Sequence, residues 1–380
     1  MELTTIGDIV SISKGKKHSS PISFPTGKAK RYIQIEDLRN DFNLKYTDEV
    51  GVDVNENDVV IAWDGANAGT IGFDLNGYIG STLARLRIKN GNVHSKYLGW
   101  LLRGKFNYLR SQCTGATIPH INKSVLEKIS VPLPALKTQI KIASILEQAD
   151  AARQKRKQAN QLTEQFLQSV FLEMFGDPVR NEKGWEVKKI SDFVKEIISG
   201  WSAQSEQRLK EKGEFGVLKV SAVTYGVFNP EEHKAVLKDS INRKLIYPLK
   251  GDVLMTRANT REMVAACCIV DKDYKDLFLS DKHWKVIFKP KMITAEYFRY
   301  VIMNNSYHEV LANKSTGTSG SMYNISKDKL LDTNFPLPPL PLQQKFASIL
   351  EQVEQLRTKQ RESEKELENL FGSLMQRYFG

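Results

Sequence analysis

The strongest constraint on this chain is a motif that occurs twice. Residues 132–148 have the sequence PLPALKTQIKIASILEQ, and residues 336–352 have the sequence PLPPLPLQQKFASILEQ. Twelve of these seventeen positions are identical at a constant offset of 204, where chance would give about one. The same offset relates Phe175-Gly176 to Phe379-Gly380. An internal repeat of this kind predicts two modules within the 380 residues rather than one large core.

Weaker matches precede each copy of the motif and keep their order along the chain. They pair Ile6-Gly7-Asp8 with Ile190-Ser191-Asp192, residues 32–35 with residues 217–220, and Asp58-Val59-Val60 with Asp252-Val253-Leu254. The regions before the motif are therefore related but diverged. Similar tails with different globular regions are expected if the tails assemble and the globular regions discriminate.

Each Pro-Leu-Pro segment is followed by about 35 residues with a helical pattern. The apolar positions form one heptad series with the same phase in both copies, and Arg156 and Gln360 occupy equivalent inward positions near its middle. Because both helices leave their domains in the same way, their pairing predicts an antiparallel coiled coil with pseudo-twofold symmetry. The residues expected at the coiled-coil or partner interface are Ile142, Ile145, Ala149, Phe166, Val170, Phe346, Ile349, Val353, Leu356, Leu367, Leu370 and Leu374.

The regions before the helices have the pattern of α+β domains. Short strands are expected at 58–63, 70–74 and 83–88, and again at 252–257, 264–270 and 283–288. A helix should follow each set, at 95–111 and 294–313, and lead into a loop rich in Gly, Ser and Thr. The predicted organisation is a first domain at 1–140, a first helix at 141–180, a second domain at 181–342 and a second helix at 343–380.

Composition narrows the class of protein. The longest apolar run, about Met263 to Val270, is far shorter than the roughly 18 residues that a membrane span needs. Three cysteines, Cys113, Cys267 and Cys268, form neither a disulfide framework nor a metal-binding pair. Without a recognisable secretory signal, a cytoplasmic location is expected. The net charge of +11 favours a polyanionic partner.

Catalytic motifs are weak or missing in the sequence. The histidines show no metal-binding spacing, and no phosphate-binding loop or adenine methyltransferase motif occurs. The nearest approach to a nuclease site is Asp177 with Glu186 and Lys188, which could hold Mg²⁺. We therefore expect no catalytic residue and no resident metal. A stand-alone Mg²⁺-dependent nuclease and a purely structural coiled-coil scaffold remain as alternatives.

Loops that mix basic, amide, hydroxyl and glycine residues suit DNA, since cations neutralise phosphates and amides or guanidinium groups can address base edges. The candidate contact residues in the first domain are Lys14, Lys16, Lys17, Arg31, Asn67, Thr114, Thr117 and His120. Those in the second domain are Trp201, Arg257, Asn259, Arg261, Thr318, Ser319 and Tyr323.

The whole pattern resembles the specificity subunit (HsdS) of type I restriction-modification systems, on the paired motifs PLPALKTQIKIASILEQ and PLPPLPLQQKFASILEQ. The resemblance implies two target recognition domains, each recognising one half of a bipartite site in double-stranded DNA, and helices that dock two methylase subunits. Restriction subunits would join through the methylases in a prokaryotic cytoplasm. The resemblance implies no cofactor in this chain, with S-adenosylmethionine, ATP and Mg²⁺ used by the partners.

Overall fold

The computed structural model describes residues 2–39, 43–115, 117–317 and 322–380. The chain forms two compact units. The first module comprises Met1–Gln158 together with Gln360–Gly380, and the second module comprises Ala159–Lys359. We refer to residues 2–135 as the first globular domain and to residues 176–339 as the second.

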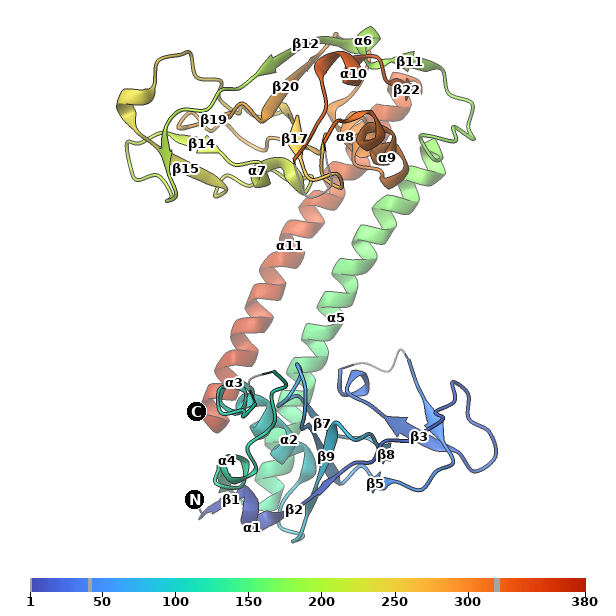
Figure 1. The fold of residues 1–380 in the computed structure, drawn as a ribbon, viewed down its shortest axis with the longest axis vertical. Helices are drawn as coiled ribbons and strands as arrows, with labels where there is room; N and C mark the ends of the chain where they lie inside the picture. Colours follow the sequence, from blue (N-terminus) through green and yellow to red (C-terminus); the bar gives the residue numbers. More distant parts are fainter. Residues whose placement is uncertain (1, 40–42, 116, 318–321) are drawn as a thin grey trace. The chain divides into compact units, whose positions relative to one another are not determined.

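Two helices of 40 residues, α5 (Leu136–Phe175) and α11 (Leu340–Phe379), dominate the fold (Figure 1). They begin at Leu136 and Leu340, before the expected residues 141 and 343. In α11 the first turn contains Pro341, which is tolerated there because the N–H groups of a first turn have no intrahelical partner. The first helix ends at Phe175 rather than at 180. Gly176 follows with φ +74°, a left-handed conformation that ends helices and that glycine adopts without strain.

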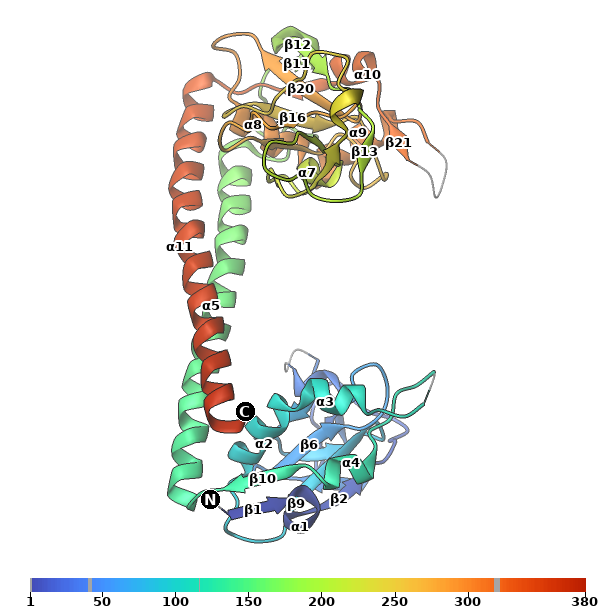
Figure 2. The ribbon, with the colours of Figure 1, turned by 90° about the vertical axis from the view of Figure 1, so that its left-hand side faces the viewer.

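The first globular domain is α+β. Its elements are β1 (Glu2–Thr5), α1 (Ile6–Ile9), β2 (Val10–Lys14), β3 (Lys30–Ile33), η1 (Glu36–Leu38), β4 (Tyr46–Thr47), β5 (Val52–Val54), β6 (Asp58–Ala62), β7 (Ile71–Gly72), β8 (Gly77–Ile79), β9 (Leu83–Ile88), α2 (Ser95–Gly104), α3 (Phe106–Ser111), α4 (Lys123–Glu127) and β10 (Ser130–Leu133). One sheet has the order β2-β9-β6-β7, and a second has the order β4-β3-β8-β5. Strand β1 pairs with β10, beside which it lies in Figure 2.

The second globular domain repeats this plan. Its elements are β11 (Val187–Lys189), α6 (Ile190–Phe193), β12 (Val194–Ser199), β13 (Ser205–Glu206), β14 (Gly216–Leu218), α7 (Ser221–Thr224), β15 (His233–Val236), η2 (Lys238–Ser240), β16 (Val253–Thr256), β17 (Ala258–Asn259), β18 (Cys267–Ile269), β19 (Leu277–Phe278), β20 (His283–Phe288), α8 (Ala295–Ile302), α9 (Asn305–Lys314), β21 (Tyr323–Asn324), α10 (Lys327–Leu331) and β22 (Asn334–Pro336). Its sheets have the orders β12-β20-β16-β18, β13-β15-β14-β19, β11-β22 and β17-β21.

The two domains share one sheet and vary the other. β2-β9-β6-β7 and β12-β20-β16-β18 follow the same order. Each second sheet contains one parallel pair, β3 with β8 or β14 with β19, and an antiparallel neighbour, β4 or β15. The fourth strand differs, since β5 extends the sheet beyond β8, whereas β13 extends the other sheet beyond β15. The domains have therefore diverged at opposite edges of this sheet.

All six strand regions expected from the sequence contain a strand, but the predicted helices are divided. The segment 95–111 forms α2 and α3, and 294–313 forms α8 and α9. Asn304 explains the second break, because its side chain accepts hydrogen bonds from the N–H groups of Ser306 and Tyr307 and so caps a new helix. The strand expected at 264–270 is shortened to β18, since Ala265 has φ +66°.

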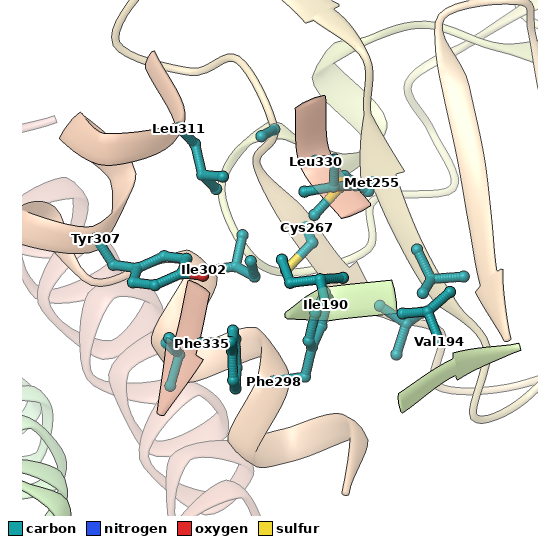
Figure 3. Close-up of a cluster of buried hydrophobic side chains, with 14 of the residues drawn as sticks. Ile190, Val194, Met255, Cys267, Phe298, Ile302, Tyr307, Leu311, Leu330 and Phe335 are labelled. Carbon is teal, nitrogen blue, oxygen red and sulfur yellow. The ribbon is translucent and has the colours of Figure 1, made fainter. Parts of the chain in front are cut away.

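The core of the second module is built from aromatic and aliphatic side chains contributed by the sheet, α8, α9 and α10 (Figure 3). Phe335 and Phe298 are stacked with ring centroids 5.6 Å apart, and Tyr307 meets Phe335 edge-on. The core also takes in Phe175, from the end of α5. In the first module the equivalent position is filled by Phe379, from the end of α11. Each core is thus completed by the helix that begins in the other module.

A buried glutamine fastens the start of each long helix to its globular domain. The Gln139 amide accepts a bond from the His94 N–H and donates to the Asn92 and Pro134 carbonyls, at 2.9 Å each. The equivalent Gln343 accepts from the Thr294 N–H and donates to the Pro338 carbonyl. Both glutamines are at most 1% exposed. These bonds satisfy backbone groups that burial would otherwise leave unpaired.

No helix among the described residues is both long and apolar enough to cross a membrane.

Candidate nucleic-acid and helix interfaces

Three of the predicted contact residues in the first domain meet around the carboxylate of Asp64. The Lys14 ammonium lies 2.6 Å from one Asp64 oxygen, and the Nδ1 atom of His120 lies 2.6 Å from the other. Thr114 joins through its backbone, which exchanges two hydrogen bonds with the backbone of His120. We call Lys14, Asp64, Thr114 and His120 the first loop cluster.

Burial separates the groups of this cluster. The side chain of Asp64 is 16% exposed, whereas those of Lys14 and His120 are about half exposed, at 52% and 47%. Burial alone would raise the pKa of Asp64, but bonds from Lys14 and His120 outweigh it and lower the pKa. An ionised carboxylate below the surface thus positions two donors at the surface, where they can address an anion.

The other candidates in the first domain are placed differently. Lys16, Lys17 and Thr117 are exposed in loops. Asn67 accepts a hydrogen bond from Arg39. Arg31 does not join the first loop cluster, since it lies on β3 with its guanidinium 3.1 Å from Asp37.

In the second domain, Asn259 and Tyr323 face each other in the two-stranded sheet of β17 and β21. Asn259 donates to the hydroxyl of Thr224 at 3.0 Å. Arg257 precedes β17, and its backbone carbonyl accepts from Ile325. We call Arg257, Asn259 and Tyr323 the second loop cluster.

Arg261 and Trp201 lie outside this cluster. Arg261 forms a two-pronged ion pair with Glu309, at 2.9 and 3.2 Å, and a further bond to Asn313. Trp201 packs on Phe278 and lines a surface cavity of about 990 Å³ between residues 200–204 and 237–243. Thr318 and Ser319 fall outside the described residues.

The two loop clusters stand on the same backbone frame. Three backbone hydrogen bonds of the first domain, Lys16 N–H to Ile79 O, Trp63 N–H to Thr82 O and Ile121 N–H to Trp63 O, have counterparts in the second. The counterparts are, in the same order, Trp201 N–H to Leu279 O, Arg257 N–H to Lys282 O and Ile325 N–H to Arg257 O. The strand pairing of Asp64 with His120 likewise corresponds to that of Ala258 with Asn324. Ile121 and Ile325 are the same residue type, but the polar and aromatic positions differ, such as Lys16 against Trp201, Trp63 against Arg257 and His120 against Asn324. The frame is shared, and the chemistry presented on it is not.

The long helices pair in antiparallel fashion within each module. In the second module Leu167 packs with Leu350 and Val353, and Phe171, one turn later, packs with Phe346. In the first module, Arg153 bonds to Glu368 on the far half of α11. Residue numbers thus rise along α5 as they fall along α11.

Two ion pairs between the helices are copies of each other under the offset of 204. Arg153 binds Glu368 through two bonds of 2.7 and 2.8 Å. Arg357, the repeat partner of Arg153, binds Glu164, the repeat partner of Glu368, at 2.5 Å. The pseudo-twofold relation therefore extends from the sequence to individual bonds.

Comparison with known proteins identifies the family. The family model for the type I restriction modification DNA specificity domain matches residues 1–164 and 182–369. The chain belongs to that family.

Relatives of this specificity family include the type I restriction enzyme MjaVIII specificity subunit of Methanocaldococcus jannaschii, which is 28% identical over 394 residues, covering 98% of this chain and 91% of the relative. The EcoEI specificity subunit of Escherichia coli is 29% identical over 169 residues, covering 44% of this chain and 28% of the relative. The fold is similar to the crystal structure of the type I system S subunit from M. genitalium, with a TM-score of 0.64 at 15% identity over 100% of this chain and 96% of that one.

The residues expected at the helix interface differ in burial from one end of each helix to the other. Ile142, Phe346 and Val353 are buried as expected. Ile145, Ala149, Val170, Ile349, Leu367 and Leu374 are partly buried. Phe166, Leu356 and Leu370 are about half exposed, at 53%, 48% and 52%, so they lie outside the buried seam, and their place at a partner interface stays a prediction.

The buried positions beyond the middle are one residue further along, at Leu167 and Phe171 in α5. A straight α-helix drifts from a heptad register by about 20° per heptad, so four heptads accumulate about 80°, close to the 100° between neighbouring residues. The strict heptad count from Ile142 therefore reaches Val170 where the helix presents Phe171. Near the middle, Gln360 is buried and Arg156 half-buried, at the polar positions expected there.

The alternative nuclease site has a structural role instead. One oxygen of Asp177 accepts hydrogen bonds from the N–H groups of Val179 and Arg180, and the other accepts from the hydroxyl of Ser306. Glu186 pairs with Lys188 at 3.4 Å. Among the described residues, no group of three or more His, Cys, Asp or Glu side chains is placed to hold a metal ion. Asp177 anchors the segment that follows α5.

Sequence reasoning missed the residues that organise the site. Asp64 was not selected because a carboxylate is an unexpected choice for a DNA-binding surface. Gln139 and Gln343 were missed as well, although both belong to the repeated motif. The signal that could have found the glutamines was available, since a polar residue kept at the same repeat position is a candidate for a shared structural bond.

Proposed function

We propose that this chain is the DNA specificity subunit of a type I restriction-modification complex, in which each globular domain contacts one half of an asymmetric, bipartite duplex site. The observation that carries the proposal is the shared loop frame with different side chains. Two readers of identical half-sites would present the same groups, whereas the first loop cluster presents a lysine and a histidine and the second an arginine, an asparagine and a tyrosine.

The chemistry of these groups suits duplex DNA. Lys14 and His120 can donate to phosphates or to guanine acceptors, and Asn259 can form the paired bonds that an amide makes with adenine. Release of counterions from the backbone makes such binding weaken steeply with salt. Salt-independent binding to DNA would contradict the proposal.

The remaining parts of the proposal concern the partners. Two methylase subunits would dock on the paired helices, restriction subunits would join through the methylases, and these partners would use S-adenosylmethionine, ATP and Mg²⁺. Methylation requires the target base to leave the duplex, and this chain would determine where that occurs. It would perform no chemistry itself.

The test is the methylation pattern of a host that carries this gene together with its methylase partner. The wild-type chain should yield one asymmetric motif of two separated halves. His120→Ala should relax or change one half only, and Asn259→Ala the other half only. Lys137→Ala, which removes an exposed charge at the start of α5, is the control and should leave both halves unchanged. A palindromic motif, or a change in both halves from one substitution, would contradict the proposal.

A further inference from the structure

A second surface feature of the molecule is unsuited to DNA. In the second module a groove of about 630 Å³ runs between α8, the first half of α11 and the residues after α7. Its lining includes the apolar Val227, Ile269, Ala347 and Leu350, with Val227 58% exposed. Four carboxylates also line it, from Asp271, Glu296, Glu351 and Glu354, against one guanidinium, that of Arg299, and Glu354 is already paired with Arg357. A groove that combines these groups in a chain of net charge +11 repels phosphate and favours a cation.

The corresponding place in the first module shows what such carboxylates bind. There the Lys96 ammonium lies 2.6 Å from Asp74 and 2.7 Å from Glu147. These bonds raise the pKa of Lys96, Asp74 contributing most, so the ammonium is held in its charged form. The first module thus supplies its own cation.

The repeat places Glu296 where the first module has Lys96. The register is fixed by the next residue, since Tyr97 and Tyr297 donate equivalent bonds to the carbonyls of Pro132 and Pro336. Glu351 is the repeat partner of Glu147, at the offset of 204. The second module therefore keeps the carboxylate that accepts the bond, Glu351 for Glu147, but has a second carboxylate, Glu296, where the first module has the Lys96 ammonium. In the part of the chain that the structure describes, no hydrogen bond or ion pair engages the carboxylate of either Glu296 or Glu351.

In the first module an aromatic ring fills the space that corresponds to the centre of this groove. The ring of Phe73 packs on Trp100 and under the guanidinium of Arg103, at 5.5 and 4.4 Å. A Cβ atom on Gly99 would lie 2.2 Å from that ring, so Phe73 fills the space. In the second module the sheet register puts the smaller Ile269 in place of Phe73. Arg299, in place of Gly99, is turned to the Gly226 carbonyl, to which it donates at 2.7 Å.

We propose that this groove docks a protein segment that carries a lysine beside an apolar side chain. The cation would bind between Glu296 and Glu351, as Lys96 binds Glu147 in the first module, and the apolar side chain would cover Ile269 and Leu350. The inference rests on the proposed function in one respect, namely that a specificity subunit assembles with other subunits. It adds that the two modules offer those subunits different surfaces.

The experiment uses the full-length chain and the purified methylase subunit with which it assembles. Glu296→Lys would place the missing cation within the chain, recreating the pair made by Lys96, and should weaken binding of the methylase at this module about tenfold or more. Glu351→Gln should weaken it several-fold. Glu182→Lys makes the same change of charge at an exposed position of the connecting segment and should leave binding unchanged. Thermal melting of each variant checks that the fold is intact.

A second measurement locates the contact. A carbodiimide joins a carboxylate to an amine in direct contact, so treatment of the complex should link Glu296 or Glu351 to a lysine of the methylase. Unchanged binding by folded Glu296→Lys, or links from the groove only to a second copy of this chain, would overturn the proposal. Sequence-specific DNA binding is measured on the same complex. If the complex shows no sequence-specific DNA binding but the cross-link forms, the proposed function is overturned and the groove remains assigned. If DNA binding is specific but no cross-link from the groove to the methylase forms, the groove assignment is overturned and the proposed function stands.

Discussion

The two globular domains share a backbone frame, and the side chains carried on it differ at matched positions. Where the first has Asp64 and His120 facing each other, the second has Ala258 and Asn324. Bonds between main-chain groups do not depend on side-chain identity, so they survive divergence of the loops. What differs is what a partner meets at the surface. The comparison teaches that conserved geometry and variable chemistry can be separated within one chain.

The largest expected effect tests whether each module is completed by the helix that begins in the other. Phe379→Ala should destabilise the first module and Phe175→Ala the second, each by about 3–4 kcal/mol, because both rings are buried. Hydrogen exchange resolved along the sequence would measure this. Faster exchange in both modules from either substitution would show that the modules do not unfold separately.

The next largest effect on the free energy of unfolding depends on the register of the two long helices. Leu167→Ala should cost roughly 2–4 kcal/mol, while Phe166→Ala should cost less than about 0.5 kcal/mol, because Leu167 is 1% exposed and Phe166 is 53% exposed. Phe371→Ala and Leu370→Ala form the matched pair in the first module. Denaturant unfolding measures all four. A greater cost for Phe166 than for Leu167 would restore the strict heptad register.

A pH effect distinguishes the modules at one core position. His283 is fully buried and burial lowers its pKa to about 4, while Leu83 takes the matched place on β9. The unfolded histidine accepts a proton near pH 6.5, so stability should fall as the pH drops from 6.5 towards 4 and change no further below that. At pH 5 the loss is on the order of 2 kcal/mol.

The variant His283→Leu tests this through the slope of the unfolding free energy against pH. The variant loses the bond to Ser280, so its stability at pH 7.5 can differ from that of the wild type. The dependence of unfolding free energy on pH between 6.5 and 4 should nevertheless be shallower. Parallel curves for the two proteins would exclude His283 as the titrating group.

The smallest effect on stability is expected from the two repeat-related ion pairs between the helices. Double-mutant cycles on Arg153 with Glu368 and on Arg357 with Glu164 should each give no more than about 1 kcal/mol, because the glutamates are more than half exposed. Both values should shrink in 0.5 M salt. Coupling in only one pair would show that the repeat symmetry of the bonds is not a symmetry of energies.

The sequence predicted the parts of this fold that local pattern and repetition determine. The modules, the long helices and the six strand regions of the two shared sheets belong to this group. The second sheet of each domain did not follow from it, since its strands have only two to four residues and owe their position to a neighbour rather than to their own pattern. The edge strands β2 and β12 of the shared sheets were also not predicted. The helix starts were placed a few residues late because the first boundary was set at the apolar heptad series, whereas α5 and α11 begin at Leu136 and Leu340, directly after the proline-rich segments.

Candidate contact residues were chosen by type, and type does not show which partner lies nearby. Arg31 and Arg261 have the same chemistry as a DNA-binding arginine, yet the fold pairs them with Asp37 and Glu309. Conversely, Asp64 would be discarded by charge alone, and only the folded chain shows it holding Lys14 and His120. Loop chemistry is therefore predictable as a region, whereas its individual contacts depend on tertiary structure.

The uneven division of the chain between the modules has a consequence for the order in which the parts of each module are translated. The second module is one continuous stretch, residues 159–359, whereas the first draws on residues 360–380 as well. The core of the domain that is translated first therefore lacks Phe379 until the last turn of α11 has been made, whereas every residue of the second module has by then been translated. A nascent chain halted between the two repeats would hold an N-terminal domain without its final helix.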